Sequence, residues 1–219
     1  MTQSTGPGLK IAIFGAAGRA GSTAVAEARR RGHQVTAIAR DRSRYHGEAD
    51  DGVHLVEGDV TDPDTVAALT AGHDAAINTT AVYGEGTDPD AFFPAASRAL
   101  IKGLTQAGVS RLVTVGLSAL LPGPDGTPGM DAPDFPAMFK PFCLAHGAGL
   151  EVLRTEGGTL DWVWVSPAGD FDHDGARAGR YEIREQPAAQ ARISYADFAI
   201  ALVDEVQQPH HHRAQVIVS

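Results

Sequence analysis

Three glycines follow a short apolar run near the start of the sequence. Residues 10–14 read KIAIF, and Gly15, Gly18 and Gly21 come next, before an alanine-rich segment. In such a series the first glycine allows a tight turn, the second lets a ligand approach the backbone, and the third lets a helix lie close to a strand. The N–H groups and the positive dipole end of that helix attract anions. The pattern therefore predicts a turn that holds the diphosphate of a dinucleotide.

Glycines at this spacing also occur in ordinary turns, and the alternative interpretation is a purely structural bend. The order of strand, turn and helix favours the binding site, because this is the context that the motif requires. The predicted contacts of this segment with the cofactor are Gly15, Ala17, Gly18, Arg19, Ala20 and Gly21.

The residues after the second apolar run, 34–39, indicate which dinucleotide is bound. An acidic residue at this point usually accepts the ribose 2′-hydroxyl of NAD, whereas an arginine binds the 2′-phosphate of NADP. Arg40 stands there, followed by Arg42 and Arg44, and the guanidinium fork matches a phosphate well. We expect NADP(H) to be preferred over NAD(H). Asp41 is the residue that would reverse this choice, and a solvated basic loop without a ligand is the remaining alternative.

Apolar runs alternate with helix-compatible segments along the chain. The expected strands are residues 10–14, 34–39, 53–57, 74–79, 111–116, 161–166 and 215–219, and the expected helices are 20–32, 62–72, 90–108, 138–158 and 193–206, the last with Ser194 as N-cap. This alternation predicts a parallel sheet covered by helices on both faces, a Rossmann-type doubly wound α/β fold. We expect one domain over residues 1–219, with 1–8 as a flexible lead-in. Two irregular stretches, 120–136 and 166–192, are expected to lie on the substrate side, where they could cover a site.

Composition and charge narrow the function classes. The formal net charge of −9 disfavours nucleic acid as a partner, since phosphate backbones select for clustered cations. Cys143 is the only cysteine, so no intrachain disulfide can form, and a reducing cytoplasm is the expected location. The N-terminus lacks the features of a signal peptide, and no apolar run approaches a membrane span. We expect no membrane association.

Two histidine and acid clusters invite a metal site, and we predict none. Residues 210–212 are three consecutive histidines, but neighbouring side chains on an extended segment point to opposite faces. Asp170, Asp172 and Asp174 alternate around His173 but lack the glycine and distal glutamate of a calcium-binding loop.

Five segments resemble a known family: IAIFGAAGRAGS from Ile11, GDVTD from Gly58, LVTVGLSAL from Leu112, LDWVWVSPAG from Leu160 and RISYADFAIALVDEV from Arg192. Over nearly its whole length the chain is similar to atypical short-chain dehydrogenases/reductases of the NAD(P)H-binding, NmrA-like group, which includes flavin reductase and biliverdin reductase B-like proteins. The last two segments are the more specific to that group.

The resemblance implies a cofactor path along the carboxyl ends of the strands, where open α/β sheets bind ligands. Asp59 and Val60 would flank the adenine. The ribose and diphosphate would lie along Asn78, Thr79, Thr80 and Ala81. The nicotinamide would face Gly116, Leu117 and Ser118, and Pro167 and Ala168 would close over its carboxamide.

The usual catalytic pair of short-chain reductases, a tyrosine followed four residues later by a lysine, is missing. Phe139 stands where relatives can have the tyrosine, and Lys140 is one place away from the required spacing. Ser118 could hydrogen-bond a substrate and His146 could donate a proton, and these are the two candidate catalytic residues. Tyr83, Ser118 and Phe139 are the candidate substrate contacts. The serine could equally cap its loop, and the histidine and Tyr83 could serve in packing.

Hydride transfer to a conjugated acceptor needs little acid from the enzyme, because charge spreads over the acceptor. The sequence therefore favours an NAD(P)H-dependent oxidoreductase that reduces a small conjugated or aromatic acceptor, as a flavin reductase does, and that is a monomer or homodimer. The alternative is a sensor that binds NADP without catalysis, and a sugar epimerase or isomerase is a weaker third interpretation.

Overall fold

The computed structural model describes residues 8–47 and 52–219, so the lead-in predicted for residues 1–8 lies outside the described part except for Gly8. Its main sheet contains β1 (Lys10–Phe14), β2 (Gln34–Ala39), β3 (Val53–Glu57), β4 (Ala75–Asn78), β5 (Arg111–Val115), β6 (Asp161–Pro167), β8 (Ile183–Arg184) and β10 (Ala214–Val218). The strand order is β3-β2-β1-β4-β5-β6-β10-β8, and β8 alone runs antiparallel to its neighbour. The order reverses between β1 and β4, which is where Rossmann folds bind ligands.

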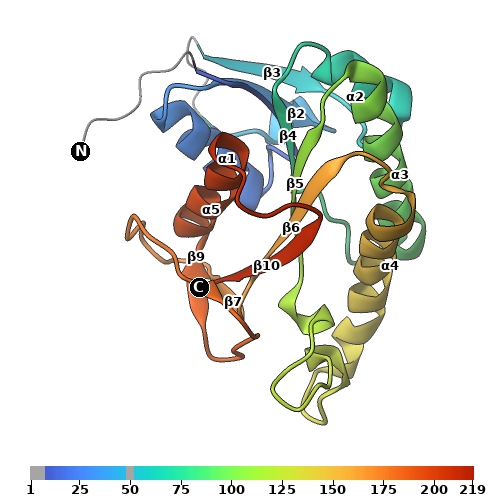
Figure 1. The fold of residues 1–219 in the computed structure, drawn as a ribbon, viewed down its shortest axis with the longest axis vertical. Coiled ribbons are helices and arrows are strands. Elements are labelled where there is room, and N and C mark those ends of the chain that lie inside the picture. The colour runs from blue at the N-terminus through green and yellow to red at the C-terminus, as the bar shows by residue number, and fades with distance from the viewer. Residues whose placement is uncertain (1–7, 48–51) are drawn as a thin grey trace.

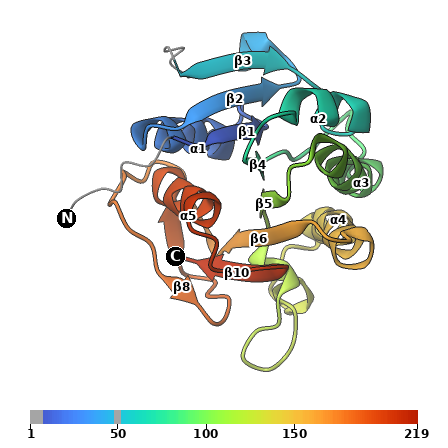
Figure 2. The same cartoon turned by 45° about the horizontal axis from the view of Figure 1, so that its top comes forward.

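Five helices cover the two faces of this sheet (Figures 1 and 2): α1 (Arg19–Arg30), α2 (Pro63–Thr70), α3 (Pro89–Ala107), α4 (Lys140–Glu156) and α5 (Tyr195–Gln207). Figure 2 shows α1 and α5 together on one face and α2, α3 and α4 on the other. Each face has its own buried core, one centred on Phe198 and one on Phe14 and Leu100. The strands are apolar on both sides because both sides are covered. The predicted Rossmann-type α/β fold is confirmed.

The stretch 166–192, expected to be irregular, contains regular structure. After β6 the chain forms β7 (Asp170–Asp172), and β9 (Arg192–Ser194) pairs with it in parallel as a separate two-stranded sheet. The short β8 lies between them in sequence and joins the edge of the main sheet at β10. These strands are only two or three residues long, too short to show an apolar periodicity that a sequence could reveal.

Four short 3₁₀ turns complete the described elements: η1 (Arg42–Arg44), η2 (Ser118–Leu120), η3 (Gly129–Asp131) and η4 (Ala137–Phe139). The loop 120–136 extends away from the sheet beside the start of α4 (Figure 1). An ion pair of 2.6 Å between the Lys140 ammonium and the Asp131 carboxylate ties this loop to α4.

Candidate cofactor site

The glycine turn after β1 has the geometry that its sequence predicts. Gly15 adopts a left-handed backbone conformation with φ of 80°. The N–H groups of Gly15 and Ala16 donate to the carbonyl oxygen of Ile38 at 3.0 and 3.1 Å, which joins the turn to the end of β2. Gly18 N–H donates to Gly15 O at 2.9 Å, and Gly21 packs against the same carbonyl. The turn is therefore built from close backbone contacts.

The N-terminus of α1 carries no side-chain cap. Gly18 is its N-cap residue, its first turn has no acidic residue, and its first residue is Arg19. By contrast, α2, α3 and α5 each have a capping side chain and an acid in the first turn, namely Asp62 with Asp64, Asp88 with Asp90, and Ser194 with Asp197. The first N–H groups of a helix have no partner within the helix, so those of α1 are left to an external acceptor.

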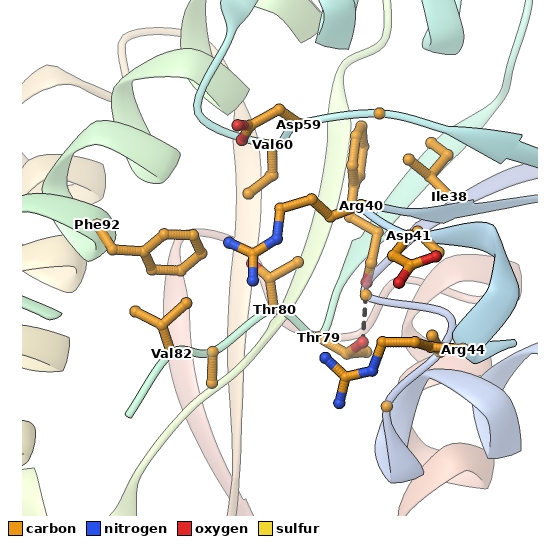
Figure 3. Close-up of a pocket in the computed structure, with 17 residues that line it drawn as sticks. Ile38, Arg40, Asp41, Arg44, Asp59, Val60, Thr79, Thr80, Val82 and Phe92 are labelled. Atoms are coloured by element: carbon orange, nitrogen blue, oxygen red, sulfur yellow. Dashed lines mark hydrogen bonds between the residues drawn. The ribbon is translucent and has the colours of Figure 1, made fainter. Parts of the chain in front are cut away.

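A cleft of about 230 Å³ opens beside this turn, at the carboxyl ends of β1 to β4 (Figure 3). Nine residues predicted to bind the cofactor line it: Gly15, Ala17, Gly18, Arg40, Asp59, Val60, Thr79, Thr80 and Ala81. They come from four segments of the sequence, and the parallel sheet brings them to one edge. The structure thus gathers the residues predicted for the adenine, ribose and diphosphate.

Asn78 and Thr79 hold the floor of the cleft in place. Thr79 donates from Oγ1 to the Phe14 carbonyl at 2.8 Å, the bond drawn in Figure 3 across the strand ends. Asn78 Oδ1 accepts from the Thr80 hydroxyl at 2.7 Å, while its amide donates to Thr114 Oγ1 on β5 at 3.2 Å. Asn78 itself does not line the cleft, so its contribution is to orient the loop after β4.

Two arginines border the cleft at the end of β2. Arg40 and Arg44 are exposed, and within residues 8–47 and 52–219 neither forms an ion pair. The neighbouring Asp41 carboxylate instead accepts from the Ser43 N–H at 2.9 Å and hydroxyl at 2.6 Å, and these bonds lower its pKa. The guanidinium groups therefore remain available for an anionic ligand.

Apolar residues that the sequence analysis missed form part of the cleft wall. Val82 and Phe92 lie on one side and Ile38 on the other, as Figure 3 shows. Phe92 belongs to α3, and only the folded chain brings that helix to the end of β4. The apolar run 34–39, which contains Ile38, was visible in the sequence, but which of its side chains faces the cleft was not. This wall offers a surface for a flat ring such as adenine.

The other predicted cofactor contacts lie outside this cleft. Arg19, Ala20 and Gly21 form the first turn of α1 and do not line it. Gly116 follows β5, where a Cβ would stand 1.9 Å from Trp164 Nε1, and Leu117 comes next. Pro167 ends β6, and Ala168 N–H donates to Val218 O at 2.7 Å. These residues share the carboxyl edge of the sheet with the cleft, one or two strands further along.

The two candidate catalytic residues have different surroundings. Ser118 begins η2 beyond the end of β5 and is 8% exposed. His146 is buried on α4, with its ring centroid 4.3 Å from that of Phe93 and 4.9 Å from that of Trp164. Burial lowers the pKa of His146 to about 3, so the imidazole is neutral at physiological pH. This placement favours packing and gives no support to its predicted role as proton donor.

The start of α4 has no tyrosine followed four residues later by a lysine. Phe139 ends η4 with its ring half exposed, and Lys140 is engaged with Asp131. Tyr83 is 77% exposed and its ring meets the edge of Phe142 at 6.2 Å. Tyr83 and Phe139 thus present aromatic surface near the start of α4.

Neither irregular loop lines the cleft: in the part of the chain that the structure describes, no residue of 120–136 or 166–192 belongs to its wall. The same described residues contain no group of three or more His, Cys, Asp or Glu side chains that could hold a metal ion. His211 pairs with Glu205 at 2.6 Å and His212 with Asp161 at 2.9 Å. No described helix is both long and apolar enough to cross a membrane.

The strand order, the glycine turn and the cleft at the carboxyl ends of β1 to β4 define a Rossmann-type protein. The profile of the NAD(P)H-binding family matches residues 15–209, and the chain belongs to that family. The uncharacterized protein YwnB of Bacillus subtilis is 35% identical over 217 residues, which cover 96% of this chain and 98% of YwnB.

Solved structures agree with this assignment. A Burkholderia pseudomallei protein proposed to be exported has 35% identity and a TM-score of 0.81, covering 96% of this chain and 99% of its own. A Streptococcus pneumoniae protein proposed to be an NADH-flavin reductase has 33% identity and a TM-score of 0.79, with the same coverage. A Bacteroides thetaiotaomicron protein proposed to be an epimerase has 28% identity and a TM-score of 0.84, covering 96% of each chain.

Proposed function

We propose that this protein is an NAD(P)H-dependent oxidoreductase that reduces a small conjugated or aromatic acceptor, in the manner of a flavin reductase. Membership of the NAD(P)H-binding family supports a nicotinamide cofactor, and the similarity to the Streptococcus pneumoniae protein supports reduction as the chemistry. When bound, the cofactor supplies the hydride. The chain has to hold it, orient its nicotinamide and exclude water.

One observation carries the proposal: a single cleft joins the uncapped start of α1 to the arginines after β2. The free N–H groups of α1 suit a diphosphate, and the wall formed by Val60, Val82 and Phe92 suits an adenine. Side chains at the ends of β5 and β6 continue along the same edge, where the nicotinamide would follow. The residues present therefore fit a dinucleotide along its length.

NADPH is the proposed cofactor. Arg40 and Arg44 border the adenosine end of the cleft without carboxylate partners in the described residues, so a 2′-phosphate would supply the missing anion. Asp41 would favour NADH, but it caps η1 through Ser43 and is already satisfied there. Within the described residues Arg40 and Arg44 form no ion pair, and although the Arg44 charge helps to lower the pKa of Asp41, two arginines beside one hydrogen-bonded carboxylate favour the phosphorylated dinucleotide.

The acceptor site is proposed at the carboxyl ends of β5 and β6, near the start of α4. A conjugated acceptor spreads the charge that hydride transfer creates, and water can then supply the proton. The Ser118 hydroxyl would donate to an oxygen of the acceptor, and the exposed rings of Tyr83 and Phe139 would contact its plane. We propose a cytoplasmic monomer or homodimer acting on a small molecule.

A sensor that binds NADP without catalysis is the second candidate. The observation that favours it is the lack of a proton donor at α4, where Phe139 stands in the place of the tyrosine and His146 is buried and neutral. An epimerase, as proposed for the Bacteroides thetaiotaomicron relative, is less well supported because the missing tyrosine would be needed to move protons.

The test is to mix purified protein with NADPH or NADH and a panel of flavins, quinones and enones, and to follow the absorbance of the reduced nicotinamide. Oxidation by at least one acceptor supports the reductase, whereas tight NADPH binding with no oxidation by any acceptor supports the sensor. Ser118→Ala should lower turnover, with Ser110→Ala at the opposite end of β5 as the matched control. Unchanged turnover of Ser118→Ala would remove this serine from the reaction.

A further inference from the structure

A contact between distant parts of the sequence lies beside the glycine turn. Arg19, the first residue of α1, is 2.6 Å from His173 across a separation of 154 residues, measured from Nη1 to Nδ1. The Tyr195 hydroxyl lies 3.4 Å from the same Nδ1. A guanidinium has only donors, so Nδ1 accepts and the imidazole carries its proton on Nε2. The three side chains come from the start of α1, the segment after β7 and the start of α5.

The tyrosine of this group is held rigidly. Phe171 on β7 stacks on the Tyr195 ring with centroids 4.2 Å apart and planes within 10°, and it meets the buried Phe198 edge-on at 5.0 Å. The pairing of β7 with β9 places Phe171 opposite Ile193, two residues before the tyrosine. The small sheet absent from the sequence-based expectation thus fixes the phenol next to the glycine turn.

The Arg19 guanidinium of this group lacks an ion-pair partner among the described residues, and the carboxylate that acts on the group is that of Asp170, whose charge adds to burial in raising the pKa of Tyr195. Within the described residues the Arg19 guanidinium has no carboxylate at ion-pair distance, and a neutral imidazole does not compensate its charge. The Arg19 guanidinium also stands at the positive end of α1, where a cation is unfavourable. Burial raises the pKa of Tyr195, although the nearby Arg19 opposes this, so the phenol keeps its proton and can donate. An anion between these groups and the glycine turn would satisfy all of them.

We propose that Arg19, His173 and Tyr195, which lie outside the lining of the cleft, form an additional outer wall of the diphosphate site, opposite the backbone amides of the glycine turn. In this proposal the Arg19 guanidinium exchanges its hydrogen bond to His173 for one to a diphosphate oxygen, and the Tyr195 hydroxyl and His173 ring complete the wall. His173 and Tyr195 thus hold the diphosphate bridge, on which the position of the nicotinamide half depends. The inference rests on the proposed function, because it requires that a dinucleotide binds in the cleft.

Calorimetry with three probes tests the proposal: NADP⁺, 2′-phospho-ADP-ribose, which keeps the diphosphate but lacks nicotinamide, and adenosine 2′,5′-bisphosphate, which has no diphosphate bridge. Tyr195→Phe and His173→Ala should each weaken the first two by about ten-fold, the loss expected for a hydrogen bond to a charged group. Both variants should bind the bisphosphate within about two-fold of wild type. His54→Ala, an exposed histidine on β3, is the matched control and should change nothing.

The outcomes distinguish failure of the outer wall from failure of dinucleotide binding. If both variants bind all three probes as wild type does, or lose affinity equally for all three, the outer wall is refuted while dinucleotide binding stands. A loss confined to NADP⁺ would assign the residues to the nicotinamide and would also refute the diphosphate contact. If wild-type protein binds none of the probes, the proposed function itself fails.

Discussion

Gly21 lies against the backbone carbonyl oxygen of Gly15, so that a Cβ atom on residue 21 would stand 2.1 Å from that oxygen. Contact at this distance is impossible, and the groups to be moved are backbone atoms of the glycine turn. Gly18 is different, because its Cβ would stand 3.3 Å from the same oxygen and its own backbone is extended, with φ of −82°. Packing therefore requires a glycine at position 21. Position 18 has more room, and it lines the cleft in which the ligand would lie.

Gly21→Ala should destabilise the protein by about 3 kcal/mol, because the start of α1 must move away from β1. Chemical denaturation monitored by circular dichroism measures this change. Gly18→Ala should unfold within about 1 kcal/mol of wild type but bind NADP⁺ at least about ten-fold more weakly, since its methyl group would face the diphosphate. Equal stability of the two variants would show that the contact with Gly15 is not limiting.

Arg40→Ala should weaken NADPH binding by about ten- to one-hundred-fold and leave NADH binding within about two-fold, because it removes a charge-assisted bond to the 2′-phosphate. Arg44→Ala should act in the same direction. Arg42→Ala is the matched control, since Arg42 belongs to the same η1 turn but does not line the cleft. Titration of both dinucleotides by calorimetry checks this, and an equal loss for NADPH and NADH in Arg40→Ala would contradict the NADPH preference.

His146 should make the stability of the protein depend on pH between about 6.5 and 3. Burial lowers its pKa to about 3 in the folded state, from about 6.5 when unfolded. The unfolded state therefore binds a proton first, so stability is full above pH 6.5 and is lost as the pH falls. By pH 4.5 the loss should be about 2 to 3 kcal/mol. Urea unfolding at pH 7 and pH 4.5 measures it, and in His146→Leu the difference should shrink. If His146→Leu lost as much stability between pH 7 and pH 4.5 as wild type does, His146 would not be the group responsible for this loss.

Glu27 should make the stability of the protein depend on pH in a second range, more acidic than that of His146. Burial of its carboxylate favours the neutral form, but hydrogen bonds and charges from Arg30 and Arg31 outweigh it and lower the pKa to about 2. Glu27 and Arg31 also join α1 to Asp204 on α5, through a bond of 2.5 Å from Arg31. Since the folded pKa lies below the usual glutamate value of 4.5, this stabilisation is present above pH 4.5 and is lost as the pH falls towards 2.

Glu27→Gln should therefore lower stability at pH 7 by about 3 kcal/mol and flatten the decline below pH 4.5, measured by urea unfolding. Glu151→Gln, at an exposed position of α4, is the control and should change stability by less than about 0.5 kcal/mol. A Glu27→Gln variant as stable as wild type at pH 7 would show that the pairs with Arg30 and Arg31 contribute nothing.

Much of the fold could be predicted from local patterns. Seven apolar runs became strands, five segments became helices, and Ser194 caps α5 by accepting from Asp197 N–H at 3.0 Å. Each depends on residues close in sequence, whose propensities and periodicity are directly visible. The short β7, β8 and β9 could not be predicted, because their pairing depends on partners far along the chain.

Some residues of the candidate site could likewise be predicted from local sequence, and others could not. Gly15, Gly18 and Arg40 were identifiable because the turn and the strand end that carry them are continuous in sequence. Phe92 and Val82 were not, because only the packing of α3 against the sheet edge brings them to the cleft. The sequence also left His146 open as a proton donor, and its burial among aromatic rings was visible only in the structure.

Taken alone, the amino-acid sequence determined the α/β class and the position of the glycine turn after β1, and it predicted a preference for a 2′-phosphate, because these follow from residue types at short separations. Tertiary structure decided which side chains share a space: the cleft wall, the pKa of His146 and the contact between Arg19 and His173. Those properties depend on burial and on distances between segments, and a linear pattern of residues contains neither.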